Sequence, residues 1–226
     1  MIELVRRRMM MGGSALPYDA EVDFLESHGS QYIDTEYIGT GYDRFDVQVA
    51  LTNLSNGDTS LVFLSDVFGT IVNIKNHMHA LVLLRERAAN WIAVWLYNKY
   101  NVVQFTYLKP TRFTEAQLLN FHIIKGKLND IYIDNVLNHP TTNAAPSPNL
   151  IYPYFLFAAN MSGKPYYATS YLRIRYFKLW DRNDNLVRDM IPVRVGVTGY
   201  MYDRVTQKMF GNQGTGQFII GPDKTA

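Results

Sequence analysis

The chain contains no cysteine among its 226 residues. This absence excludes disulfide bonds, thiolate metal sites and cysteine nucleophiles. Charged residues make up only 19% and hydrophobic residues 47%, a composition too apolar for a disordered chain. No apolar run approaches the ~20 residues that a membrane-spanning helix requires. The composition therefore predicts a folded domain with its own core and no membrane partner.

Positive charge is concentrated at the N-terminus. Residues 1–13 contain Arg6, Arg7, Arg8 and Glu3, which are three of the 22 basic and one of the 20 acidic residues. The rest of the chain therefore has 19 of each sign and no net charge. Phosphate-backbone binding requires many cationic contacts, so we expect no nucleic-acid partner.

Residues 1–20 are predicted to form an arm that docks on a partner. Their apolar stretch is shorter than the roughly 7–15 residues of a signal-peptide core, and an unsupported tail is the other alternative. Arginine forks bind carboxylates and carbonyls, and methionines adapt to irregular contact surfaces. The expected docking residues are Leu4, Val5, Arg6, Arg7, Arg8, Met9, Met10 and Met11.

The body from residue 21 onwards shows the period-two alternation of β-strands. The alternation is clearest in 44–51, and it recurs in 102–107, 119–123 and 171–180. The last segment changes phase near Tyr176, which predicts a β-bulge. The residues that we expect to be buried between two sheets are Phe45, Val47, Val49, Phe121, Ile123 and Phe155.

Turn sequences separate these short strands, and only residues 114–117 favour as much as one turn of helix. Many short strands with frequent aromatic residues are typical of two packed antiparallel sheets. The sequence therefore predicts an all-β, two-sheet antiparallel sandwich formed by residues 21–226 as one domain, preceded by the arm.

Four stretches of the body resemble a known family. They are EVDFLESHGSQYIDT (21–35), DIYIDNVL (130–137), RYFKLW followed by LVRDMIPV (175–193), and GYMYD through GNQGTG to GP (199–222). These stretches are similar to motifs of concanavalin A-like, laminin-G-like modules found in phage and prophage virion proteins, including those of gut bacteria. Asn135 stands where those modules carry a turn glycine, and asparagine also tolerates left-handed backbone.

The resemblance implies a jelly-roll body and a structural role in a phage particle. We accordingly expect a non-enzymatic virion protein that decorates the capsid, forms part of a head fibre or attaches to the tail. The expected partners are capsid, portal or tail proteins and further copies of the chain, and no cofactor is expected.

A glycosidase is one alternative. Glu21, Asp23 and Glu26 match the E-x-D-x-x-E pattern of laminarinase-like retaining glycosidases, which share the jelly-roll fold. Such enzymes need two carboxyl groups ~5–5.5 Å apart. The three acids here lie on the first strand of the body rather than mid-chain on a central strand, so we predict no catalytic residue.

A glycan-binding adhesin is the other alternative. Tyrosines cluster around the proline-rich segment 138–149, and Tyr171 belongs to the same cluster. Aromatic rings stack on sugars or anchor protein interfaces. The candidate contact residues, toward a host surface glycan or a protein partner, are Tyr152, Tyr154, Tyr166 and Tyr167.

Metal binding is not predicted. His77 and His79 would share one face of a strand, but a zinc site takes three or four ligands. The aspartates that offer oxygen ligands of the kind that calcium takes are Asp34, Asp130, Asp134 and Asp203, and their spacing does not require a site.

Overall fold

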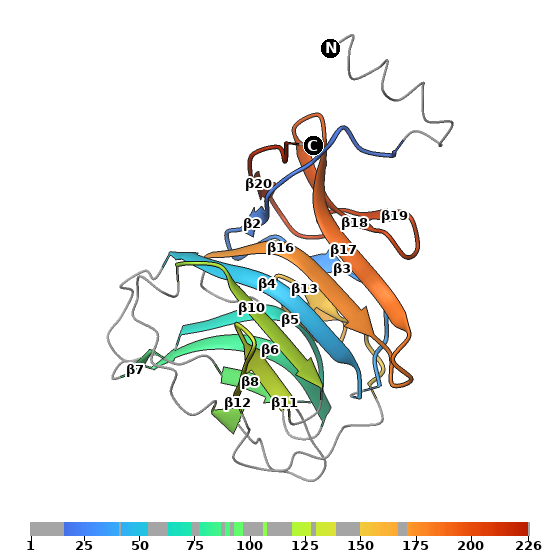
Figure 1. The fold of residues 1–226 in the computed structure, drawn as a ribbon. Coiled ribbons are helices and arrows are strands. Elements are labelled where there is room, and N and C mark those ends of the chain that lie inside the picture. Colours follow the sequence, from blue (N-terminus) through green and yellow to red (C-terminus); the bar gives the residue numbers. More distant parts are fainter. Residues whose placement is uncertain are drawn as a thin grey trace.

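The computed structural model describes residues 16–40, 42–53, 63–73, 77–86, 89–90, 93–96, 106–107, 119–127, 130–138, 150–166 and 171–225. These residues form strands and connections without a helix, which confirms the all-β prediction (Figure 1). The strands are β1 (Ala20–Glu21), β2 (Leu25–Ser27), β3 (Ile33–Asp34), β4 (Arg44–Asn53), β5 (Phe63–Asn73), β6 (His77–Glu86), β7 (Ala89–Asn90), β8 (Ala93–Leu96), β9 (Thr106–Tyr107), β10 (His122–Lys127), β11 (Asp130–Ile133), β12 (Val136–Asn138), β13 (Phe155–Leu156), β14 (Ala159–Met161), β15 (Lys164–Tyr166), β16 (Tyr171–Trp180), β17 (Leu186–Val195), β18 (Thr198–Asp203), β19 (Lys208–Phe210) and β20 (Ile219–Ile220).

The strands are arranged in two sheets. The first has the order β12-β11-β10-β4-β16-β17-β18-β19, with β1, β2 and β20 attached to it. The second has the order β15-β14-β5-β6-β8-β9, with β3, β7 and β13 attached. Among the described strands one pairing departs from the antiparallel prediction, because β14 runs parallel to β5. Phe157, between β13 and β14, has a φ of 64°, and the chain reverses its direction along β5 at this point.

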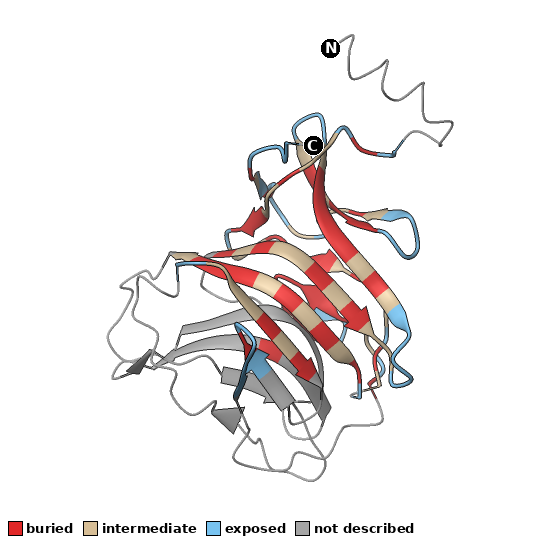
Figure 2. Cartoon of the chain, viewed as in Figure 1, coloured by how far each residue is buried: buried red, intermediate tan, exposed pale blue. Residues whose placement is uncertain are grey.

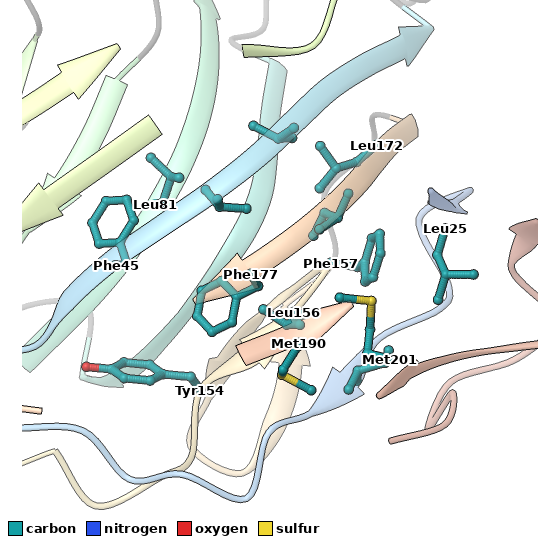
Figure 3. Packing of buried hydrophobic residues seen from close by; sticks show 14 of the residues in the cluster. Leu25, Phe45, Leu81, Tyr154, Leu156, Phe157, Leu172, Phe177, Met190 and Met201 are labelled. Carbon is teal, nitrogen blue, oxygen red and sulfur yellow. The ribbon is translucent and has the colours of Figure 1, made fainter. Parts of the chain in front are cut away.

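The core lies against the inner face of the first sheet. Phe45, Val47 and Val49 of β4 are buried, as predicted, and the polar residues between them are not (Figure 2). Leu156 of β13 and Leu81 of β6 belong to the same apolar cluster, so both sheets contribute to one core (Figure 3). Because a strand exposes alternate residues to opposite faces, the pattern of β4 fixes which side is apolar.

The prediction for β10 is wrong in phase. Phe121 and Ile123 are only half-buried, whereas Ile124 is fully buried and Leu119 is 45% exposed. Ile124 is the partner of Val47, whose side chain faces the core. A shift of one residue in a strand exchanges its two faces, so the pairing with β4 decides which residues are buried.

The predicted bulge in β16 is present. Ile174 and Tyr176 pair with the adjacent residues Val49 and Gln48 of β4, so Arg175 is the extra residue. The two residues at the bulge, Arg175 and Tyr176, are both half-buried, while the residues that flank them, Ile174 and Phe177, are fully buried. The bulge thus places two consecutive long side chains on the outer face of the first sheet.

The two central strands β16 and β17 separate beyond their paired segment. Residues Phe177 to Trp180 of β16 pair with β17, whereas the earlier residues Leu172 to Ile174 pair with β2. The far end of β17 pairs with β1. The segment from residue 20 to 27 therefore fills the fork between the two strands, and the C-terminal residues pair in turn with this segment through β20 and through the bridge between Val22 and Asp223 (Figure 1).

Candidate functional site

The outer face of the first sheet has a depression at the fork, with a volume of about 640 Å³. Strands β4, β16 and β17 contribute residues to it, as do the connection between β1 and β2, the turn after β18 and the C-terminal segment. The lining side chains on which its chemistry depends are Asp23, Asp46, Gln48, Arg175, Tyr176, Lys178, Asp189 and Lys224. The depression is therefore polar, on the side of the sheet opposite the core.

Ion pairs and hydrogen bonds hold the lining side chains in place. Arg175 Nη2 donates to Asp23 Oδ2 at 2.8 Å, and the Tyr176 hydroxyl donates to Asp46 Oδ1 at 2.9 Å. Lys178 Nζ lies 3.7 Å from Asp189 Oδ1. These contacts hold the charged side chains of the lining against one another.

Tyr176 keeps its proton throughout the neutral range. Burial, followed by the hydrogen bond to Asp46 and the charge of that carboxylate, raises the pKa of Tyr176 above its ordinary value. The hydroxyl therefore acts as a hydrogen-bond donor to Asp46.

Two polar atoms of the depression lack a hydrogen bond. Among the described residues, Arg175 Nε and Asp189 Oδ1 are buried without a hydrogen-bond partner. A buried polar atom left in this state costs roughly 1–3 kcal/mol. Both atoms belong to residues that line the depression, and neither has a hydrogen-bond partner among the described protein groups.

The half-buried ring of Phe121 is covered by an arginine side chain. The guanidinium of Arg175 lies 3.7 Å from the centre of the Phe121 ring, and that of Arg173 lies 4.5 Å from the centre of the Phe24 ring. The two rings are 6.2 Å apart. Cation–π contacts thus shield these rings on the outer face, next to the depression.

The acids of the E-x-D-x-x-E pattern are each held by a different arginine. Arg204 lies 3.3 Å from Glu21, and Asp23 pairs with Arg175. Glu26, buried on the outer face, accepts from Arg173 Nε at 2.7 Å and contacts His28 at 3.1 Å. The absence of glycosidase activity remains a prediction.

One of the four predicted contact tyrosines does not lie on the surface. Tyr154, expected on the surface, is instead a core residue: it is fully buried, and its hydroxyl donates to Asp43 Oδ2 at 2.8 Å. Its ring and hydroxyl therefore serve the core rather than a ligand. Tyr152 is half-buried, Tyr166 ends β15, and Tyr167 lies outside the described residues.

The residues considered as metal ligands have other roles where their side chains are described. Asp203 accepts from the Asp189 amide and the Thr206 hydroxyl, and Asp134 contacts His122 at 2.7 Å. The described part of the chain holds no group of three or more metal-ligating side chains. The expectation that the protein takes no metal remains a prediction.

The docking residues predicted for the arm, from Leu4 to Met11, lie outside the described residues, which begin at Leu16. The next part of the arm is attached to the body. Tyr18 is buried with its ring 5.1 Å from that of Tyr202, and the Asp19 amide donates to the Arg194 carbonyl at 2.8 Å.

No protein-family model and no curated protein matches the chain. Within the residues that the structure describes, no helix is long and apolar enough to cross a membrane.

The sequence analysis did not identify the depression as a site. A signal was present, because Asp46 and Gln48 alternate with the core residues of β4, and Lys178 lies between the core residues Phe177 and Leu179 of β16. This signal gives the polar face of each strand, but it does not show which strands are neighbours or where they separate.

Proposed function

We propose that the protein is a non-enzymatic structural subunit of a phage particle, with a concanavalin A-like jelly-roll body and an N-terminal arm that binds other virion proteins. The resemblance over residues 21–222 supports the family, and an all-β body with one core shared by two sheets agrees with it.

The observation that carries the proposal is the position of the N-terminal segment. Arg194 donates to both carboxylate oxygens of Asp223, at 2.7 and 2.6 Å, and its carbonyl accepts from the Asp19 amide. The first described residues and the C-terminal segment therefore meet at one end of the molecule, beyond β17 and β18 (Figure 1). Leu16 is 51% exposed there, and Val197, in the turn between β17 and β18, is 81% exposed.

This arrangement suits a tethered subunit. The basic, methionine-rich residues continue from an anchored point at one end, so they can reach a neighbouring protein without disturbing the body. Fixing a segment of chain against a partner costs conformational entropy, so the neighbouring subunit must supply the compensating contacts. Apolar side chains next to the anchor extend the surface available for those contacts.

The pairing of the acids supports a non-enzymatic role. Glu21, Asp23 and Glu26 each bind a separate arginine, whereas a retaining glycosidase uses a pair of carboxyl groups that converge on one sugar. The burial of Tyr154 removes one member of the surface predicted for an adhesin.

Deletion of residues 1–13 tests the proposal. We expect the truncated protein to keep its melting temperature, because the anchor at Tyr18 remains, and to be absent from purified particles. The surface variant Lys208→Met, which removes an exposed pair with Glu36, serves as the control and should be incorporated normally. Normal incorporation of the truncated protein would contradict the proposed docking role.

A further inference from the structure

We propose that the depression at the fork of β16 and β17 is a docking site for an acidic segment of a protein partner, whose carboxylates bind the exposed cations of the depression. The site belongs to the body of the protein and lies beyond the docking role proposed for residues 1–13, on which it does not depend. The fixed walls of the depression, the greater exposure of its cations and one cation that pairs with none of the described acids together favour this ligand.

The walls of the depression are set by backbone pairing. It forms where β16 and β17 separate. The C-terminal segment is held in place there by two backbone hydrogen bonds: the Asp23 amide donates to the Pro222 carbonyl at 2.8 Å, and the Lys224 amide donates to the Glu21 carbonyl at 2.9 Å. The depression, with its volume of about 640 Å³, is therefore built into the fold and is present before a ligand arrives.

The cations of the depression are more exposed than its carboxylates. Its ion-paired cations are Arg175, Lys178 and Arg204, and its carboxylates are Asp23, Asp46 and Asp189. The cation side chains are between 33% and 47% exposed, whereas the carboxylate side chains are between 14% and 29% exposed. A ligand that approaches from solvent therefore meets positive charge first, while the less exposed carboxylates stay in their ion pairs.

Lys224 adds a positive charge that the depression does not balance. The acids within and beside the depression are each paired: Asp23 with Arg175, Asp189 with Lys178, Asp46 with Lys125 and Glu21 with Arg204. Lys224 is exposed, and no acid in the described part of the chain pairs with its ammonium group. A single positive charge thus remains, and a carboxylate of the ligand neutralises it without breaking an existing pair.

The lining suits an acidic peptide better than a nucleic acid or a cationic ligand. Gln48 lines the depression, and its side-chain amide both donates and accepts, so it can bond to the backbone amides of a peptide. Binding to nucleic acid requires many cationic contacts, and Lys224 is the single cation of the lining that none of the described acids pairs with. A cationic ligand would meet the exposed guanidinium and ammonium groups before it reached a carboxylate. An acidic peptide supplies both the charge and the amide groups that this lining complements.

Fluorescence anisotropy of the whole chain at low salt, with a short dye-labelled peptide of alternating glutamate and alanine, tests the proposal. We expect this peptide to bind and to be released as the salt concentration rises, and the same peptide with glutamine in place of glutamate not to bind. Lys224→Glu should weaken binding at least ~5-fold. Lys164→Glu is the matched control, because Lys164 is also exposed, pairs with none of the described acids, and lies on β15 at an edge of the second sheet. This control changes the net charge by the same amount and should leave binding within ~2-fold of the wild type.

Lys178→Met provides a second test, because it removes an exposed cation of the depression and should also weaken binding of the glutamate peptide. The proposal is overturned if the glutamate peptide does not bind at low salt, or if the glutamine peptide binds as well. It is overturned if Lys224→Glu and Lys164→Glu weaken binding equally, or if neither Lys224→Glu nor Lys178→Met weakens it. It is also overturned if free glutamate at the same concentration displaces the peptide, because the ligand would then be a small carboxylate, or if an oligonucleotide binds more tightly than the peptide and loses this affinity in Lys224→Glu.

Discussion

The two faces of the first sheet are made by the same strands, but they differ in burial and in charge. On β16, Ile174, Phe177 and Leu179 point inward and are completely buried. Arg173 and Lys178, from the same strand, lie outward in ion pairs with Glu26 and Asp189. Apolar burial contributes roughly 25 cal/mol per Å², whereas exposed ion pairs contribute ~0–1 kcal/mol. The inner face therefore stabilises the fold, and the outer face is free to be shaped by binding.

The largest expected effect comes from removing an inner side chain. Phe177→Ala deletes a fully buried ring from the core that both sheets share (Figure 3). We expect the free energy of unfolding to fall by about 3–5 kcal/mol, measured by urea denaturation. A loss below about 1 kcal/mol would mean that the inner face does not dominate stability.

The second effect comes from an outer-face acid that is nevertheless buried. Glu26→Gln removes the charge that holds Arg173, His28 and the Thr52 hydroxyl. We expect a loss of about 1–3 kcal/mol, because the Arg173 guanidinium loses its charged partner. Glu36→Gln, at an exposed pair with Lys208, is the matched control and should cost under ~1 kcal/mol. Equal losses in the two variants would show that burial of the acid is irrelevant.

A third, smaller effect concerns the Tyr176 hydroxyl. Tyr176→Phe removes the hydrogen bond to Asp46 and should cost about 0.5–1.5 kcal/mol at neutral pH.

The same variant should change how the free energy of unfolding depends on pH in the alkaline range. Because the folded protein raises the pKa of Tyr176, the unfolded chain ionises first, from about pH 10. The contribution of Tyr176 to the free energy of unfolding is therefore fully present below pH ~10 and is lost as the pH rises above it. The free energy of unfolding of the Tyr176→Phe variant should fall less steeply with pH. Part of the decline should remain, because burial also raises the pKa of Tyr37. Identical slopes for wild type and variant would refute this contribution.

The smallest effect is expected from Lys178, the residue that follows Phe177. Lys178→Met keeps most of the aliphatic stem and removes a charge 3.7 Å from Asp189. We expect a change below ~1 kcal/mol in the same urea measurement. A loss of unfolding free energy as large as that of Phe177→Ala would show that the outer face stabilises the fold as much as the inner face does.

The sequence could predict burial where one face of a strand is uniformly apolar. In β4, Phe45, Val47 and Val49 alternate with polar residues, so only one face of the strand can face the core. The structure buries that face. Around β10, apolar residues occur at both Ile123 and Ile124, so alternation alone does not choose a face. The register with β4 chooses it, and register depends on a strand distant in the sequence.

The turn at Asp134 and Asn135 shows the same division on a smaller scale. Both residues adopt left-handed backbone, with φ of 49° and 66°. The sequence predicted this conformation for Asn135, a residue type that tolerates it. That prediction succeeds because the constraint acts within a few residues. Tyr154 is the opposite case, because it is buried in the core and its hydroxyl donates to Asp43, over a hundred residues away in the chain.

What the sequence determined by itself is therefore local: the β-strands, the bulge in β16, the turn residues and the concentration of positive charge before Gly12. These follow from period-two alternation, backbone preference and composition, which act within short stretches of chain. Only the tertiary structure decided where β16 and β17 part and which outward side chains meet in the depression there. The reason is physical, since its lining residues range from Asp23 to Lys224 and strand pairing alone brings them together.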